Sequence, residues 1–176
     1  MNEPQIDGLE LNPAASPQAV EQVEVALGFS FPQDYVDFLL RSNGAEGCIG
    51  DKAYLALYSI ELLAELNESP SPLPERLVLF GSDGGGEAFT FDRSQVPPRV
   101  IQLPFISGDP DDEIDRGGSF TEFLRGLRVE GTLPSGDADA RGGCDLENHK
   151  AAQGGPDLEG EGDPRDQADQ VRRRPD

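Results

Sequence analysis

Residues 77–92 of the chain read LVLFGSDGGGEAFTFD. Two short runs rich in apolar and aromatic residues, 77–80 and 87–92, have the length and composition of β-strands. The connection between them, residues 81–86, holds four glycines, a serine and an aspartate, which are residues that turns require. This arrangement predicts a β-hairpin, and the rest of the chain can be placed around it.

The segments next to this hairpin predict two more strands and two helices. Residues 53–58 (AYLALY) and 100–103 (VIQL) are short and apolar, which indicates strands. Ser59 precedes leucines at helical spacing and indicates the start of a brief helix. Residues 119–122 (SFTE) have the S-x-x-E form of a capping box, so we expect the last helix to begin there.

Two further helices are predicted before the first of these strands. A short extended lead at residues 9–13 is followed by Ser16 and Pro17, which favour the N-cap and the first turn of a helix, and Gly28 provides its end. A second helix is expected within residues 32–44. Its apolar side chains lie on more than one face, so we expect it to be buried under the sheet.

This order of elements predicts an α+β fold with a single antiparallel sheet of about four to six strands packed by helices. Ile, Leu, Val, Phe, Tyr and Met number 43 in residues 1–130 but only 4 in the last 46, and all twelve aromatic residues precede Leu124. We therefore expect one folded domain at residues 1–130 and a disordered, acidic, low-complexity tail at residues 131–176.

The chain is strongly acidic, with 34 acidic and 14 basic residues, a formal net charge of -20 and a pI of about 4.2. Residues 1–130 alone hold 23 acidic and 8 basic residues, so phosphates would repel the domain and we expect a basic protein, not nucleic acid, as the partner. No apolar stretch approaches the roughly 20 residues that span a bilayer. The first four residues (MNEP) also lack the features of a signal peptide. We expect a cytoplasmic protein that binds no membrane.

The domain segment lacks the residue patterns of common catalytic and metal sites. The one histidine, His149, lies in the predicted tail, so no Ser/His/Asp or Cys/His arrangement can form within the domain. Cys48 and Cys144 are too few for a disulfide framework or a structural zinc site. Without a histidine partner, Cys48 is expected to be a small buried hydrophobe. We expect neither catalysis nor a cofactor.

Two segments suggest ligand binding at first sight. The acidic run at residues 109–115 (DPDDEID) could hold a hard cation, but it fails the EF-hand pattern, because its sixth position is Ile114 and its twelfth is Phe120. An irregular cation site, a solvated loop and an acidic contact surface remain open for it. The glycine-rich residues 81–86 match neither phosphate-loop pattern and contain no lysine, which favours a simple hairpin turn.

Three patterns occur together in the chain: L-G-x-x-x-P-x-D-Y at residues 27–35, F-L-x-x-S-N-G at 38–44 and F-G-S-D-G-G-G at 80–86. Together with S-F-T-E-F-L at residues 119–124, they resemble the SUKH superfamily and, more narrowly, its SMI/KNR-type domains. The resemblance covers about residues 9 to 128 and implies the SUKH fold, whereas the tail matches nothing in the family.

The resemblance implies a non-catalytic protein-binding module. Bacterial members are mostly immunity proteins that bind and neutralise a toxin domain, often a nuclease or a deaminase, and an acidic protein complements the basic groove of such a toxin. The alternative is a regulatory or scaffold module that binds a cellular partner, as in the fungal regulators. A third hypothesis is an enzyme that uses carboxylates alone or with a weakly bound metal.

We expect the partner to contact carboxylates at the tip of the hairpin and in the acidic run. These residues are Asp83, Glu87, Asp109, Asp111, Asp112, Glu113 and Asp115.

Overall fold

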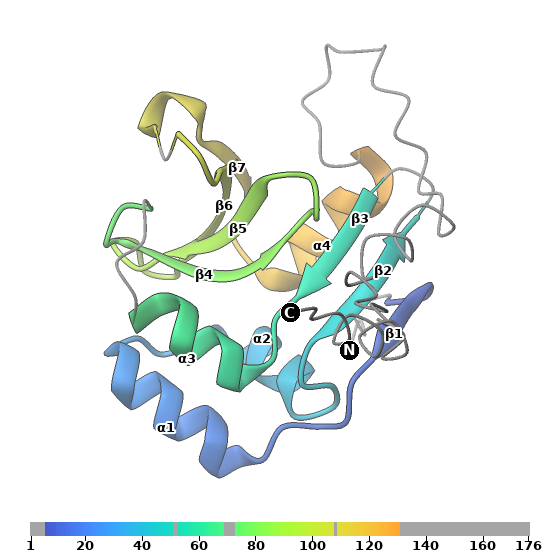
Figure 1. Cartoon of the computed structure of the whole chain (residues 1–176), viewed down its shortest axis with the longest axis vertical. Coiled ribbons are helices and arrows are strands. Elements are labelled where there is room, and N and C mark those ends of the chain that lie inside the picture. The colour runs from blue at the N-terminus through green and yellow to red at the C-terminus, as the bar shows by residue number, and fades with distance from the viewer. Residues whose placement is uncertain (1–5, 51–52, 69–72, 108, 131–176) are drawn as a thin grey trace, which may run out of the picture. The chain divides into compact units, whose positions relative to one another are not determined.

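The predicted hairpin forms the centre of one antiparallel sheet (Figure 1). The computed structural model describes residues 6–50, 53–68, 73–107 and 109–130 of the 176 residues. Within these ranges the sheet has seven strands, and each strand pairs with its neighbours along the chain, in the order β1-β2-β3-β4-β5-β6-β7. The tail predicted at residues 131–176 lies outside the described residues.

The described elements follow one another along the chain. The strands are β1 (Leu9–Leu11), β2 (Ala45–Ile49), β3 (Ala53–Leu57), β4 (Leu77–Ser82), β5 (Glu87–Asp92), β6 (Arg99–Pro104) and β7 (Ile114–Gly117). The helices are α1 (Pro17–Leu27), α2 (Gln33–Leu39), α3 (Ile60–Glu68), α4 (Phe120–Glu130) and the 3-10 turn η1 (Pro110–Asp112). The predicted α+β class and the single antiparallel sheet are confirmed.

The sheet has slightly more strands than the four to six expected. The predicted extended lead pairs with β2 and forms the edge strand β1, whereas β2 and β7 were not predicted. Alanine, glutamate and glycine fill three of the five positions of β2, and these residues have weak β-propensity. β7 begins in the last two residues of the acidic run and extends to Gly117, and its charged residues suit a strand at the edge of a sheet.

The helix-capping signals in the sequence act largely as predicted. The Ser16 hydroxyl accepts a 3.1 Å hydrogen bond from the Ala19 N–H at the start of α1. At the start of α4, the Ser119 hydroxyl accepts a 3.1 Å hydrogen bond from the Glu122 N–H. The Glu122 carboxylate accepts from the Gly118 N–H at 2.8 Å, one residue before the N–H that a standard capping box uses.

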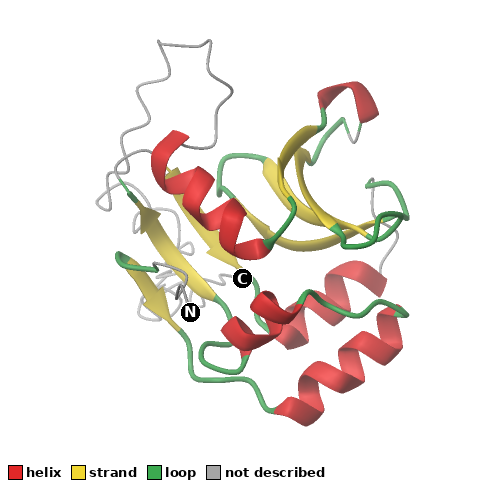
Figure 2. Cartoon of the chain, turned by 180° about the vertical axis from the view of Figure 1, so that it is seen from behind, coloured by secondary structure: helices red, strands yellow, loops and turns green. Residues whose placement is uncertain are grey.

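All four described α-helices contribute to a main core that covers one face of the sheet (Figure 2). The rings of Phe80 in β4 and Phe91 in β5 stack with their centroids 4.3 Å apart. The ring of Tyr35 in α2 lies 5.2 Å from that of Phe91 and 4.9 Å from that of Phe120 in α4. These fully buried rings therefore join α2 and α4 to the central strands.

A β-bulge interrupts the pairing of β4 with β5 at Phe80. The register between β4 and β5 shifts between Leu79 and Gly81, so Phe80 is the extra residue of β4. Gly81 lies against β3, where a Cβ atom would be only 2.7 Å from the Ala56 carbonyl oxygen. A side chain at this position would push β3 away from β4, so glycine is required by the close approach of the two backbones.

The opposite face of the central strands carries a second, smaller core. Its buried residues are Leu73, Leu77, Leu79, Ala88, Ile101 and Leu103. The part of the sheet from β4 to β7 is strongly curved (Figure 1). Arg76, just before β4, lies beside Asp92 because β4 pairs with β5, and its guanidinium also reaches the carboxylate of Glu113 before β7.

Asn43 joins three segments that are distant in the sequence. Its Nδ2 donates a 2.9 Å hydrogen bond to Glu61, and its Oδ1 accepts a 2.7 Å hydrogen bond from the Ile60 N–H at the start of α3. Its backbone N–H donates to the Pro13 carbonyl at 2.8 Å, and the Asn12 side chain donates to its carbonyl at 2.9 Å. The S-N-G pattern therefore fixes the start of α3 and the connection between β1 and α1.

The Tyr35 hydroxyl gives a test of the main core. The residue is fully buried, and its Oη has no hydrogen-bond partner among the described residues. Tyr35→Phe removes the hydroxyl and keeps the ring, so we expect the free energy of unfolding to stay the same or to rise by up to about 1 kcal/mol. Urea unfolding of the full chain measures this difference. The control Tyr35→Leu removes the ring contacts and should lower the free energy of unfolding by roughly 2 kcal/mol or more. A clear loss of stability in Tyr35→Phe would contradict the unpaired hydroxyl.

Candidate functional site

The predicted contact residues lie in two segments, the hairpin tip and the acidic run. Both segments start at the same end of the sheet. In an antiparallel meander, the β4–β5 turn and the β6–β7 connection follow strands that run in the same direction. The Phe105 N–H, at the start of the β6–β7 connection, donates a 2.9 Å hydrogen bond to the Gly86 carbonyl at the hairpin tip. The fold thus brings the hairpin tip next to the start of the acidic loop.

Asp83 and Glu87 are half-buried, and both carboxylates hold local structure. Asp83 Oδ1 accepts hydrogen bonds from the N–H groups of Gly85 at 2.7 Å and of Glu87 at 2.9 Å, which stabilises the turn. The Glu87 carboxylate accepts a 3.1 Å hydrogen bond from Gln102 Nε2. Gln102 Oε1 in turn accepts a 2.7 Å hydrogen bond from Arg116 Nε. These two carboxylates therefore present only part of their surface to a partner.

Four residues of the predicted group are exposed, namely Asp109, Asp111, Asp112 and Asp115. Asp109 Oδ1 accepts a 3.0 Å hydrogen bond from the Asp111 N–H and caps η1. Asp112 accepts a 3.0 Å hydrogen bond from the Ser107 hydroxyl. Ile106, in the same loop, is 95% exposed. The loop thus offers solvent three carboxylates and one large apolar side chain.

Glu113 and Asp115 differ from the other three carboxylates of the acidic run because each pairs with an arginine of the domain. Glu113 pairs with Arg76, and the Asp115 carboxylate lies 2.6 Å from the Arg99 guanidinium. The hydrogen bond from Arg99 lowers the pKa of Asp115. A cationic side chain of a partner would have to compete with these arginines for Glu113 and Asp115, although Asp115 is itself exposed.

The sequence analysis did not identify Asp92, the buried carboxylate that shares Arg76 with Glu113. Asp92 Oδ2 lies 2.9 Å from Arg76 Nη1, and Asp92 is only 4% exposed. Burial alone would raise the pKa of Asp92, but hydrogen bonds from Ser94 and Gln95 and the charge of Arg76 lower it overall. Arg76 and Asp92 meet only because β4 pairs with β5, and no local pattern marks the pair.

Cys48 is half-buried and disulfide-bonded, whereas the sequence analysis expected a small buried hydrophobe. The register of β2 pairs Cys48 with Tyr54 of β3. Its neighbours Gly47 and Ile49 point the other way, and Ile49 enters the main core. Since side chains alternate along a strand, Cys48 belongs to the opposite face of the sheet. The error follows from not recognising β2 as a strand.

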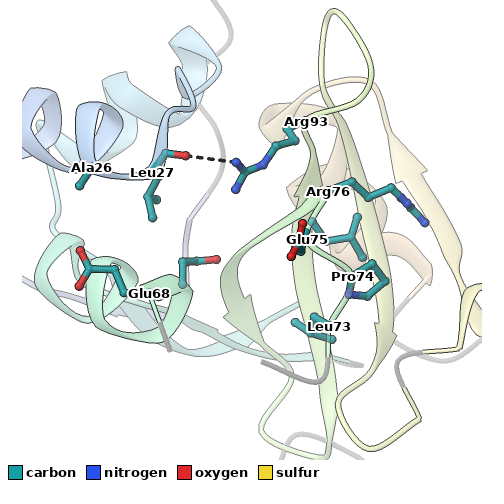
Figure 3. A pocket seen from close by; sticks show the side chains of 10 residues that line it. Ala26, Leu27, Glu68, Leu73, Pro74, Glu75, Arg76 and Arg93 are labelled. Carbon is teal, nitrogen blue, oxygen red and sulfur yellow. Dashed lines mark hydrogen bonds between the residues drawn. The ribbon is translucent and has the colours of Figure 1, made fainter. Parts of the chain in front are cut away.

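A groove of about 820 Å³ lies between the C-terminal ends of α1 and α3 and the segment that leads into β4 (Figure 3). Arg93 reaches across from the end of β5, and its Nη1 donates a 3.1 Å hydrogen bond to the Leu27 carbonyl at the end of α1. Asn67 Nδ2 donates to the Leu79 carbonyl, and Asn67 Oδ1 accepts from the Leu79 N–H, both at 2.9 Å. Arg93 therefore links the end of β5 to the end of α1, and Asn67 links α3 to β4.

In the ranges that the structure describes, no three His, Cys, Asp or Glu side chains are placed so that they could hold a metal ion. Over the same residues, no helix combines the length and the apolar character that crossing a membrane requires. His149 and Cys144 lie outside the described residues.

Fold and site together define a small α+β domain with acidic loops at one end of a meander sheet. The model of the SMI1 / KNR4 family (SUKH-1) matches residues 14–126, and the chain belongs to this family. The family includes immunity proteins, and SUKH domains typically bind protein partners.

One curated relative comes from Bacillus subtilis (strain 168) and is described as uncharacterized protein YnaB. The chain is 42% identical to it over 67 residues, which are 38% of this chain and 43% of the relative. The chain thus spans less than half the length of this relative.

The Arg76 ion pairs make stability depend on pH. Arg76→Met keeps the aliphatic stem but leaves Asp92 and Glu113 without their cation, so we expect the free energy of unfolding at pH 7 to fall by roughly 2 kcal/mol. Because the pKa of Asp92 is lowered in the folded state, its stabilising contribution is present above the unfolded value of about 3.9 and is lost as the pH falls through the lower folded value. The deficit of the variant should therefore shrink in acid, as measured by urea unfolding at a series of pH values.

Arg99→Met provides the matched control for this prediction. It removes the cation of the Arg99–Asp115 pair, whose side chains are 40% and 50% exposed, so its effect should be much smaller. An equal loss in both variants, or a deficit of Arg76→Met that stays constant down to low pH, would contradict a role of the buried Asp92.

Proposed function

We propose that the chain is a non-catalytic, immunity-type binding module that neutralises a basic toxin domain, of the nuclease or deaminase class, in the cytoplasm. The observation that carries the proposal is the exposed loop of the β6–β7 connection, in which Asp109, Asp111 and Asp112 lie near the exposed Ile106. Membership of a family that includes immunity proteins supports it.

The chemistry of this loop suits a partner that binds phosphates. A nuclease or deaminase that acts on nucleic acid needs a basic groove. The carboxylates of the β6–β7 connection can occupy the positions in that groove that phosphates of the nucleic acid would take. The apolar side chain of Ile106 adds a contact that is buried on association, with the charged residues around it. Inhibition would follow from occlusion of the groove at one-to-one stoichiometry, without catalysis or a cofactor.

The first experiment identifies the partner and tests neutralisation directly. The full chain is cross-linked in source-cell lysate at low and high salt, and each captured polypeptide is expressed and purified. A supporting result is a basic polypeptide that is an active nuclease or deaminase alone and loses its activity at one equivalent of the chain. Capture of a non-toxic cellular protein, with no effect on its activity, would favour a regulatory or scaffold module instead.

Charge variants of the loop should change the rate of association with that partner. In Asp109→Asn/Asp111→Asn/Asp112→Asn, the loss of three exposed charges should lower the association rate constant at low salt by roughly tenfold and reduce its salt dependence. Asparagine keeps the ability of Asp109 to cap η1. Stopped-flow kinetics or surface plasmon resonance measures both quantities.

The matched control neutralises three exposed carboxylates on the helices, in Glu21→Gln/Glu65→Gln/Glu68→Gln. It changes the net charge by the same amount and should alter the rate constant far less. If the two triple variants are slowed equally, only the net charge matters and the loop is not the contact surface.

A further inference from the structure

Cys48 in β2 is disulfide-bonded, and its partner is not among the described residues. The chain has two cysteines, and the second one, Cys144, lies outside the described residues. Within one chain, only Cys144 can therefore supply the second sulfur. Such a bond joins the folded domain to the segment of the chain that follows α4.

The last described residues of the chain lie near the end of the strand that carries Cys48. Gly50 follows β2 directly and has a φ of 65°. A Cβ atom on Gly50 would be only 2.6 Å from the carbonyl oxygen of Arg128, which belongs to the last turn of α4. The chain therefore reaches Glu130 beside the end of β2, two residues beyond this contact.

The length of chain between Glu130 and Cys144 is sufficient for the bond. Cys144 follows Glu130 by 14 residues, and an extended segment of this length spans up to roughly 50 Å. Cys48 points away from the main core, so the segment must pass from the side of α4 to the opposite face of β2. Layers of a protein are only about 10 Å apart, which leaves ample length for this path.

We propose that Cys48 and Cys144 form a reversible disulfide, which tethers the C-terminal segment to the face of β2 opposite the main core until a dithiol reductant releases it. The cytoplasmic location in this inference rests on the proposed function. Disulfides of cytosolic proteins are usually transient or redox-sensing, because thiol reductants keep most cysteines reduced there. A half-buried Cys48 leaves part of the bond open to such a reductant.

The release is a two-electron thiol–disulfide exchange. A thiolate of the reductant attacks one sulfur of the Cys48–Cys144 bond, which forms a mixed disulfide and frees the other cysteine as a thiolate. The second thiol of the reductant then attacks the mixed disulfide and frees the remaining cysteine. The reductant becomes a disulfide, its two protons pass to the two freed thiolates, and oxidised glutathione reverses the reaction through the same steps.

Peptide mapping of the full chain tests the pairing. Trypsin places Cys48 in residues 42–52 and Cys144 in residues 142–150. After equilibration with oxidised glutathione, a digest without reductant should contain these two peptides as one linked pair, and dithiothreitol should separate them. Two peptides of 42–52 linked to each other, or two thiols that alkylate in the untreated chain, would overturn the proposed pairing.

Reversibility is measured in glutathione buffers that run from fully oxidised to millimolar reduced. The fraction of linked peptide should fall from nearly all to nearly none across this series. A bond that persists in millimolar reduced glutathione would be a permanent cross-link, and the redox-controlled release would be wrong.

Urea unfolding with matched variants shows that the bond acts on the chain as a tether. A cross-link between residues 48 and 144 restricts the unfolded chain over a long loop, so reduction should lower the urea midpoint of the wild type by roughly 1 M. Cys144→Ser lies outside the described fold, and its midpoint should match that of the reduced wild type and should not change with dithiothreitol. An equal fall on reduction in Cys144→Ser would contradict the tether.

The partner from the cross-linking experiment separates this inference from the proposed function. If the partner is neutralised but the linked peptide pair never forms, the proposed function stands and the tether is wrong. If the pair forms and is released in reduced glutathione while no captured polypeptide is neutralised, the tether stands and the proposed function fails.

Discussion

The stacked rings of Phe80 and Phe91 are the contact on which the other elements depend. They lie on adjacent central strands, with their centroids 4.3 Å apart, and both are fully buried. Tyr35 from α2 packs against both rings, at 5.5 Å and 5.2 Å, and Phe120 from α4 packs against Tyr35. Val78 and Phe80 both face the main core, as the alternation of side chains along a strand requires, and the bulge then shifts the register of the residues that follow Phe80.

The arginines of the domain act mainly within it. Arg76, Arg99, Arg116 and Arg128 each lie within 4 Å of a carboxylate of the domain, and the Arg93 guanidinium donates to the end of α1. With 23 acidic and 8 basic residues in residues 1–130, most exposed carboxylates have no cation of the domain beside them. The resulting self-repulsion lowers stability, and a surface of this charge attracts cationic groups and repels phosphates.

The sequence analysis found the hairpin, the helices and their caps because these depend on local patterns. Ser16 and Ser119 cap the helices that their positions predicted, and the glycine-rich turn lies where its composition placed it. β2 and β7 were missed because glycine, alanine and charged residues form strands only when neighbouring strands offer hydrogen bonds. Composition pointed to the hairpin tip and the acidic run, but it did not show that Glu87 lies in β5 and Asp115 in β7, or which of the carboxylates pair with arginines. Whether a carboxylate is exposed, as Asp111 is, or paired, as Glu113 is, depends on where Arg76 lies in the folded sheet.

The hairpin tip contacts two neighbouring parts of the fold. On one side, the Gly86 carbonyl accepts a hydrogen bond from Phe105, at the start of the acidic loop, and on the other side, Gly84 lies against Tyr54. Asp83 stabilises the tip through two backbone N–H groups, so both neighbours are held by a short turn with its own hydrogen bonds. A surface that is already ordered loses little conformational entropy when a partner binds. Because Asp83 is already held in one position, the tip would lose little conformational entropy in the association that we propose.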